Sequence, residues 1–80
     1  MKLSAQISVY PLRQKELHHA VSAVRDALAA RGLEPNVGAM STVISGDAAT
    51  VFAGLQDAFE AAAATGDTVL AITISNACPT

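Results

Sequence analysis

The spacing of apolar residues changes at Pro11 from every second residue to a helical repeat, and this change limits the folds open to the chain. Residues 3–11 alternate between apolar and polar side chains, which predicts a β-strand with one buried face. Its apolar side carries Leu3, Ala5, Ile7 and Val9. Residues 14–31 then show helical spacing, and Gly32 follows as a helix-ending residue. The stripe of this predicted helix consists of Leu17, Ala20, Val21, Val24, Ala27 and Leu28.

The remainder of the chain predicts two more strands, a second helix and a final strand. Residues 33–47 are too long for one strand and contain Pro35 and Gly38, which favours a short edge strand, a tight bend and a strand over about 41–45. Asp47 is predicted to lie at the N-cap or in the first turn of a helix that Gly66 ends. The stripe of this second helix consists of Val51, Phe52, Leu55, Ala58, Phe59 and Ala62. A last strand is predicted from about Thr68 to Asn76.

The order strand, helix, strand, strand, helix, strand defines the fold class. It is the βαββαβ order of the ferredoxin-like, or split βαβ, fold, in which two helices cover one face of a four-stranded antiparallel sheet. Two layers suffice for 80 residues, so an α+β two-layer sandwich is predicted as a single domain over residues 1–80.

One face of such a sheet remains uncovered, and its predicted residues are small and uncharged. If Leu70, Ile72 and Ile74 point at the helices, the open face carries Ser4, Gln6, Ser8, Tyr10, Val69, Ala71, Thr73 and Ser75. Hydrophobic residues make up 51% of the chain and charged residues only 15%, which favours burial of this surface against a second copy. We expect a homo-oligomer, formed sheet to sheet or edge to edge. The alternative is a solvated face, because Ser and Thr are common on strand surfaces.

Charge and hydropathy exclude several classes of partner. The net charge is −2 and the five Lys and Arg residues are scattered, so no basic stripe for nucleic acid is present. No apolar run approaches the roughly 20 residues of a membrane span, and the N-terminus lacks a signal-peptide pattern. The single cysteine, Cys78, cannot form an internal disulfide. We therefore expect a soluble cytoplasmic protein with no membrane or nucleic-acid partner.

Catalytic and metal motifs are weak in this sequence. His18 and His19 are neighbours on the predicted helix and point about 100° apart, unlike a metal-binding pair four residues apart. Cys78 has no second cysteine at ligand spacing and no placed base, so packing is favoured over a nucleophilic role. Met40 is typical of a core residue, although its thioether would also suit contact with an aromatic heterocycle. We expect no catalytic residue, no metal and no cofactor.

Three further segments are distinctive: "AQISVYPLR" at 5–13, "GLEPNVGAMSTVISGD" at 32–47 and "TISNACP" at 73–79. They resemble the thiamine-binding, or YkoF-like, family. The resemblance covers nearly the whole chain, and the bend followed by Met40, Ser41 and Thr42 is its most distinctive part. It implies an ACT-like form of the ferredoxin-like fold that binds thiamine or its hydroxymethylpyrimidine moiety. Because some members carry two such domains in tandem, it also implies that this chain assembles as a homodimer or tetramer.

An aminopyrimidine needs a few uncharged donors and acceptors beside an apolar or aromatic surface. The candidate ligand-binding residues, by type or by motif position, are Ser8, Tyr10, Met40, Ser41, Thr42, Thr73, Ser75 and Asn76. A thiazolium cation would favour a ring face, which Tyr10 offers, or an acid from a neighbouring subunit. In the predicted sheet Tyr10 lies near the start of the last strand and Ser4 near its polar end, so the candidates need not form one site within a copy.

The leading interpretation is a non-enzymatic homo-oligomer that binds thiamine or hydroxymethylpyrimidine for vitamin B1 handling, transport support or sensing. The runner-up is an ACT-like regulatory or protein-interaction module without a vitamin ligand. A small enzyme that uses Cys78 is the least favoured of the three. The shortage of Lys and Arg near the candidate residues argues against a phosphate ester as the ligand, although a helix N-terminus could also hold one.

Overall fold

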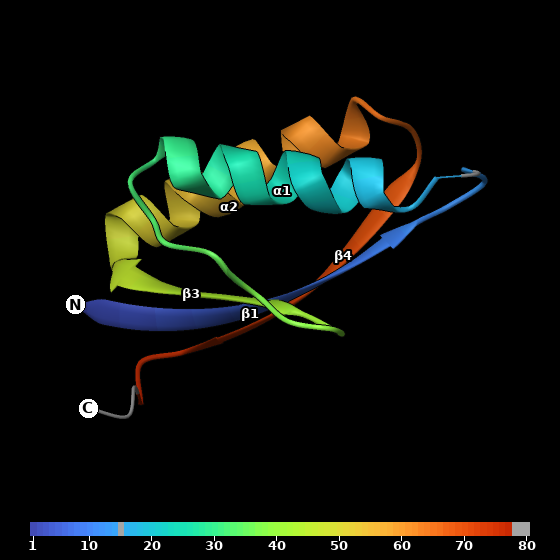
Figure 1. The fold of residues 1–80 in the computed structure, drawn as a ribbon. Helices are drawn as coiled ribbons and strands as arrows, with labels where there is room; N and C mark the ends of the chain where they lie inside the picture. The colour runs from blue at the N-terminus through green and yellow to red at the C-terminus, as the bar shows by residue number, and fades with distance from the viewer. Residues whose placement is uncertain (15, 78–80) are drawn as a thin grey trace.

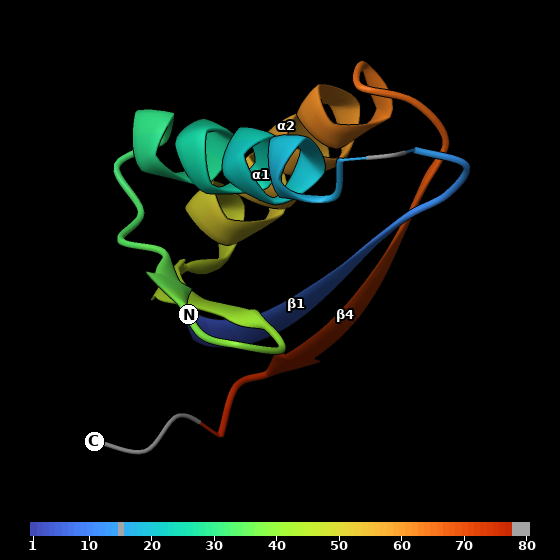
Figure 2. The same ribbon diagram turned by 45° about the vertical axis from the view of Figure 1, so that its right-hand side comes forward.

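The chain forms one four-stranded sheet with two helices on the same face (Figures 1 and 2). The structure is a computed structural model that describes residues 1–14 and 16–77. Its elements are β1 (Lys2–Pro11), α1 (His18–Ala30), β2 (Asn36–Val37), β3 (Thr42–Asp47), α2 (Ala48–Ala63) and β4 (Thr68–Ser75). The strands are antiparallel in the order β2-β3-β1-β4, so the predicted ferredoxin-like fold is confirmed.

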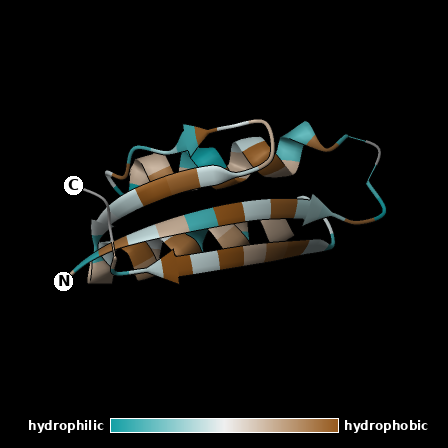
Figure 3. Cartoon of the chain, turned by 90° about the horizontal axis from the view of Figure 1, so that it is seen from below, coloured by the Kyte–Doolittle hydropathy of each residue, from teal (hydrophilic) through white to brown (hydrophobic). Residues whose placement is uncertain are grey.

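The register of the sheet places the apolar residues of β1 and β4 on the same face, toward the helices. Ile7 of β1 lies opposite Thr42 of β3 and Ile72 of β4, and Val9 lies opposite Leu70. Residues paired across neighbouring strands share a face of the sheet. Leu70, Ile72 and Ile74 of β4 therefore face the helices, as predicted. Figure 3 shows the alternation of apolar and polar residues along the strands, viewed from the open face.

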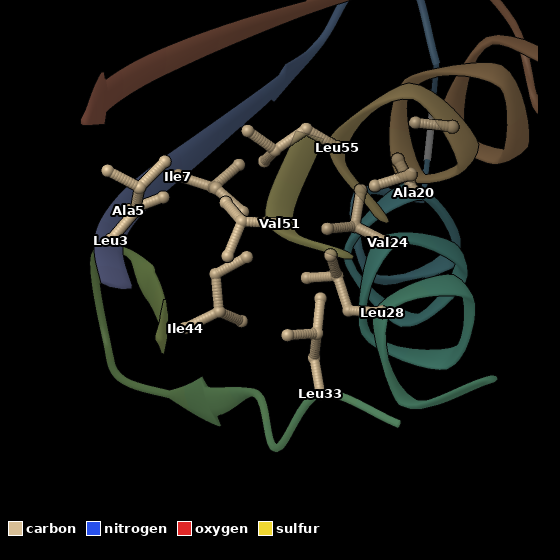
Figure 4. Close-up of a cluster of buried hydrophobic side chains, with 12 residues drawn as sticks. Leu3, Ala5, Ile7, Ala20, Val24, Leu28, Leu33, Ile44, Val51 and Leu55 are labelled. Carbon is tan, nitrogen blue, oxygen red and sulfur yellow. The ribbon is translucent and has the colours of Figure 1, made fainter. Parts of the chain in front are cut away.

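The core lies between the sheet and the two helices (Figure 4). Its buried members are Leu3, Ala5, Ile7, Ala20, Val24, Leu28, Leu33, Ile44, Val51, Leu55, Ala58 and Ala62. They include the first three apolar residues of the predicted first strand, while Val9 packs at the margin. Among the described residues, neither helix is long and apolar enough to cross a bilayer.

Gly32 ends α1 in the way that the sequence predicts. Its φ is +81°, its N–H donates to the Ala29 carbonyl at 2.9 Å, and the Leu33 N–H donates to the Leu28 carbonyl at 3.2 Å. This pair of bonds is a Schellman motif, which needs a left-handed residue that glycine adopts at little cost. The motif turns Leu33 back into the core.

The predicted start of the first helix, at residue 14, is wrong. The helix begins at His18, because Arg13 adopts a positive φ of 55° and Gln14 is held outside the helix by a bond from its side-chain amide to the Asp67 carbonyl at 3.0 Å. Leu17 is therefore the N-cap residue and is exposed rather than part of the buried stripe.

Phe52 and Phe59 were predicted in the buried stripe of the second helix, and both are instead about half exposed. α2 approaches the end of α1 closely at Gly54, where an added Cβ would lie 3.3 Å from Leu28 Cδ2 and 2.7 Å from Leu33 Cδ1, just beyond the helix. This approach fixes the rotation of α2, which turns both phenylalanines to the flank away from α1. Asp47 occupies the predicted N-cap position, although its side chain makes no capping hydrogen bond.

An ion pair joins the two helices on their solvent side. Arg31 donates from Nε to the Asp57 carboxylate, and this hydrogen bond holds the pKa of Asp57 below its ordinary value. A carboxylate with a lowered folded-state pKa adds stability above its unfolded pKa, and this contribution is lost as the pH falls through the folded pKa.

We therefore expect Asp57→Asn to lower the melting temperature at pH 7, with a difference from the parent chain that shrinks below about pH 4. Thermal unfolding followed by circular dichroism from pH 7 to pH 2.5 measures this. Asp26→Asn, which alters an exposed pair between neighbours on α1, is the control and should change the melting temperature less. If the difference in melting temperature between Asp57→Asn and the parent chain does not vary with pH, the lowered pKa of Asp57 is contradicted.

Candidate functional site

A cavity of about 110 Å³ lies between the helix-side face of the sheet and α1. Its lining residues are Ile7, Val9, Val21, Val37, Gly38, Ala39, Met40, Ser41 and Thr42. Pockets for drug-sized ligands usually measure about 300–1,000 Å³, so this cavity suits a single small ring. None of these nine lining residues is charged, and the cavity therefore favours a neutral group.

The turn between β2 and β3 forms one wall of the cavity. The Gly38 N–H donates to the Ser41 carbonyl at 2.8 Å, which closes a two-residue turn directly after the pair Val37 and Thr42. A Cβ on Gly38 would lie 3.3 Å from that carbonyl oxygen, so a larger residue would force the turn to shift. The tight turn holds Met40 and Ser41 at the cavity.

Two hydrogen bonds tie this turn to β1. The Gln6 side-chain amide donates to Ser41 Oγ at 3.2 Å, and Ser8 Oγ donates to the Met40 carbonyl at 3.3 Å. Gln6 and Ser8 lie on the open face of the sheet, because they alternate with the buried residues of β1. The position of the cavity wall therefore depends on polar groups of the opposite sheet face.

Two hydroxyl groups supply the side-chain polarity of the cavity. Thr42 is 3% exposed, and its side chain makes no hydrogen bond with the described residues, so its hydroxyl can serve a ligand. Ser41 Oγ accepts from Gln6 and keeps its own proton to donate. With the valine and isoleucine side chains opposite, the arrangement can hold a flat apolar ring and hydrogen-bond its edge.

The cavity brings together only three of the predicted ligand-binding residues: Met40, Ser41 and Thr42. Ser8 contacts the same turn from the open face. Tyr10 is exposed at the far end of β1, opposite Val69.

The other candidates lie on or beyond β4. Thr73 lies opposite Gln6, Ser75 lies opposite Ser4, and Asn76 follows the end of the strand. The separation of Tyr10 from Ser75 agrees with the register expected from the sequence. Cys78, which was predicted to be a packing residue, lies outside the described residues.

Sequence reasoning missed Val21 and Val37 as cavity residues. Val21 belongs to the helical stripe and is half-buried, and Val37 belongs to the short edge strand and is exposed. Their apolar spacing is the same as that of core residues, so only the gap between α1 and the turn distinguishes them.

His18 and His19 lie closer together than helix geometry led us to expect. Their ring centroids are 4.4 Å apart, and the Glu16 carboxylate lies 3.3 Å from His18 Nε2 and 3.7 Å from His19 Nε2. All three side chains are more than half exposed and can reorient in solvent. We assign no metal site to them.

Several solved structures have a similar fold. A domain of unknown function from Bacillus cereus is 22% identical, with a TM-score of 0.80 over 94% of this chain and 75% of the other. A protein from Streptococcus pneumoniae is 23% identical, with a TM-score of 0.85 over 94% of this chain and 86% of the other. A Thermotoga maritima protein described as a thiamine biosynthesis or salvage protein is 18% identical, with a TM-score of 0.81 over 94% of this chain and 83% of the other. At these identities the similarity establishes the fold.

The family of the chain follows from a comparison with protein-family models. Curated proteins give no match. The family model described as thiamine-binding protein matches residues 5–76. This range includes β1 from Ala5 onward, the whole of β2, β3 and β4, both helices and the turn at the cavity. The chain therefore belongs to the thiamine-binding protein family.

Proposed function

We propose that this protein binds thiamine or its hydroxymethylpyrimidine moiety in the cavity beside the β2–β3 turn, without catalysing a reaction. The observation that carries the proposal is the chemistry of that cavity, an apolar slot with two hydroxyls at one edge and no charged lining residue. Membership of the thiamine-binding protein family supports the choice of ligand.

The pyrimidine half of the vitamin fits this chemistry better than a phosphate ester does. Its flat ring would lie against Ile7, Val9 and Val21, and its ring nitrogens would accept hydrogen bonds from the Ser41 and Thr42 hydroxyls. A phosphate would favour a cationic side chain, and none lines the cavity. Binding of this kind requires no metal and no cofactor.

Met40 would cover the bound ring. Its side chain is 87% exposed although its residue lines the cavity, and a flexible thioether can fold over an aromatic ligand. The thiazolium half would then extend from the cavity mouth toward solvent or toward a second copy.

The remaining predicted residues are assigned to contacts between copies rather than to the cavity. Tyr10, Thr73 and Ser75 share the open sheet face, whose central residues are uncharged between strand ends that carry Lys2 and Asp47. Such a face can be buried without leaving a charge unpaired. We therefore propose a homo-oligomer, with Asn76 near the contact between copies. We propose that this assembly serves vitamin handling or sensing in the cytoplasm.

The double substitution Ser41→Ala with Thr42→Val tests the binding mode. It removes both hydroxyls and, with the Ser41 hydroxyl, the hydrogen bond from Gln6, while the Met40 carbonyl still ties the turn to Ser8. The affinity for hydroxymethylpyrimidine should therefore fall at least about tenfold. Isothermal titration calorimetry measures the change. Ser45→Ala, an exposed serine of β3 outside the cavity lining, is the matched control and should leave the affinity unaltered. Equal affinities for the double variant and the parent chain would show that the two hydroxyls do not contact the ligand and that its site lies elsewhere.

A further inference from the structure

Met40 differs from the other residues of the cavity in its exposure. It is 87% exposed although it lines the cavity, and it is even more exposed than Met1, the other methionine of the chain, at 79%. Among the described residues, the buried core contains no methionine. The thioether beside the cavity is therefore open to small reactive molecules in the solvent, and its modification would not disturb the core.

The β2–β3 turn fixes the backbone of Met40 and leaves its side chain mobile. The Met40 carbonyl accepts a hydrogen bond from Ser8 Oγ at 3.3 Å, and the Gly38 N–H donates to the Ser41 carbonyl across the turn at 2.8 Å. The side chain itself is unbranched and rotates about three bonds. A chemical change at the sulfur would therefore alter what this side chain can contact while the turn stays in place.

We infer that Met40 is an oxidation site through which peroxide weakens the binding of hydroxymethylpyrimidine in the cavity. The inference rests on the proposed function, in which the thioether covers the bound ring. In the reaction the sulfur attacks one oxygen of hydrogen peroxide, an S–O bond forms as the O–O bond breaks, and the other oxygen leaves with both protons as water. The sulfur loses two electrons to the peroxide and becomes a sulfoxide.

A sulfoxide at residue 40 would no longer cover the ring. Oxidation converts a flexible apolar side chain into a polar one, and burying a polar oxygen without a donor is unfavourable. The side chains against which the ring would lie, those of Ile7, Val9 and Val21, offer no donor. The oxidised side chain therefore stays in solvent, and the ring loses its contact with the sulfur.

The sulfoxide would also compete with the ligand for hydrogen-bond donors. Ser41 and Thr42 follow Met40 directly in the turn, and their hydroxyls are the groups proposed to donate to the ring nitrogens. A sulfoxide oxygen within reach of these hydroxyls accepts the same protons. Among the described lining residues there is no cationic side chain to hold it elsewhere. Loss of the cover and competition for the donors both weaken binding.

The effect should be confined to binding and should be reversible. Because Met40 is exposed, its oxidation should shift the melting temperature by less than about 3 °C, as an ordinary surface change does. A dithiol acting through methionine sulfoxide reductases returns the thioether, since the sulfoxide oxygen leaves as water while the two thiols form a disulfide. Unchanged folding with altered affinity distinguishes this site from oxidative damage.

Mass spectrometry of peptides from the peroxide-treated chain tests whether Met40 is reactive. Without ligand, Met40 should oxidise at a rate within about fivefold of Met1, because both are exposed. Saturating hydroxymethylpyrimidine should slow the oxidation of Met40 and leave that of Met1 unchanged. A ligand-free rate for Met40 that is more than about fivefold below that of Met1 overturns the inference.

Calorimetric titration of the oxidised chain tests the control of binding. Its affinity for hydroxymethylpyrimidine should be at least about fivefold below that of the reduced chain and should recover after treatment with the reductases. Met40→Gln, which places a polar group at a similar reach, should lower the affinity without peroxide. Met40→Leu is the matched control: it should bind nearly as the parent does and should not respond to peroxide, although it keeps Met1 and Cys78.

The outcomes separate this inference from the proposed function. Equal affinities of the reduced and oxidised chains overturn the inference alone, because the cavity then still binds its ligand. A peroxide effect of the same size in Met40→Leu also overturns it, since another residue is then responsible. An unmodified chain that does not bind hydroxymethylpyrimidine overturns the proposed function and this inference with it.

Discussion

Replacing Leu28 by alanine should lower the free energy of unfolding by about 2–5 kcal/mol. The Leu28 side chain is fully buried and lies against Gly54 of α2, and its carbonyl accepts the Leu33 N–H of the Schellman motif. A loss of this size is a large fraction of the roughly 4–12 kcal/mol expected for 80 residues. Urea denaturation measures it.

Leu17→Ala is the matched control for Leu28→Ala. Leu17 is an exposed leucine at the start of the same helix, so its truncation should change the free energy of unfolding by less than about 0.5 kcal/mol. Similar losses for the two leucines would contradict the position of the core between the sheet and the two helices.

Replacing Val21 by tryptophan should weaken the binding of hydroxymethylpyrimidine at least about a hundredfold. Val21 reaches the cavity from α1, and an indole ring in its place would occupy much of the space of about 110 Å³. The substitution should affect folding less than binding, because the added ring enters existing space and Val21 is only half-buried. Calorimetric titration, together with a thermal melt of the same sample, measures both effects.

Val43→Trp is the control for the blocked cavity, since Val43 lies on the open sheet face and does not line the cavity. The affinity of this variant should equal that of the parent chain. If Val21→Trp also binds with the parent affinity, the ligand does not occupy the cavity.

The alternating pattern of β1 correctly predicted which of its residues are buried, because a strand buried on one face has no freedom in its register. Leu3, Ala5 and Ile7 are all buried, and a shift by one residue would have exposed them. The glycine that ends α1 was equally predictable, because a left-handed residue is needed there.

The helix flanks were not predictable in the same way. An apolar stripe wider than about 100° shows that a helix is amphipathic but leaves open which margin the neighbouring helix covers. The close approach at Gly54 settles this for α2 and turns Phe52 and Phe59 outward. Leu17 was misassigned because the positive φ of Arg13 and the bond between Gln14 and Asp67 are tertiary features.

The candidate site was predictable in part. The turn residues Met40, Ser41 and Thr42 stand together in the sequence, so they were bound to stay together in the structure. Tyr10 and Ser75 could be related only through the register of β1 and β4, which sets them at opposite ends of the strand pair. The cavity itself depends on the spacing between α1 and the turn, which no local pattern encodes.

Calorimetric titration of the unmodified chain with hydroxymethylpyrimidine and, separately, with thiamine tests the central claim most directly. We expect saturable binding of at least one of them with one site per chain, since the cavity is built from residues of a single copy. Absence of binding heat with both ligands at several temperatures, on a sample that circular dichroism shows to be folded, would contradict a vitamin-binding role and favour a protein-interaction module.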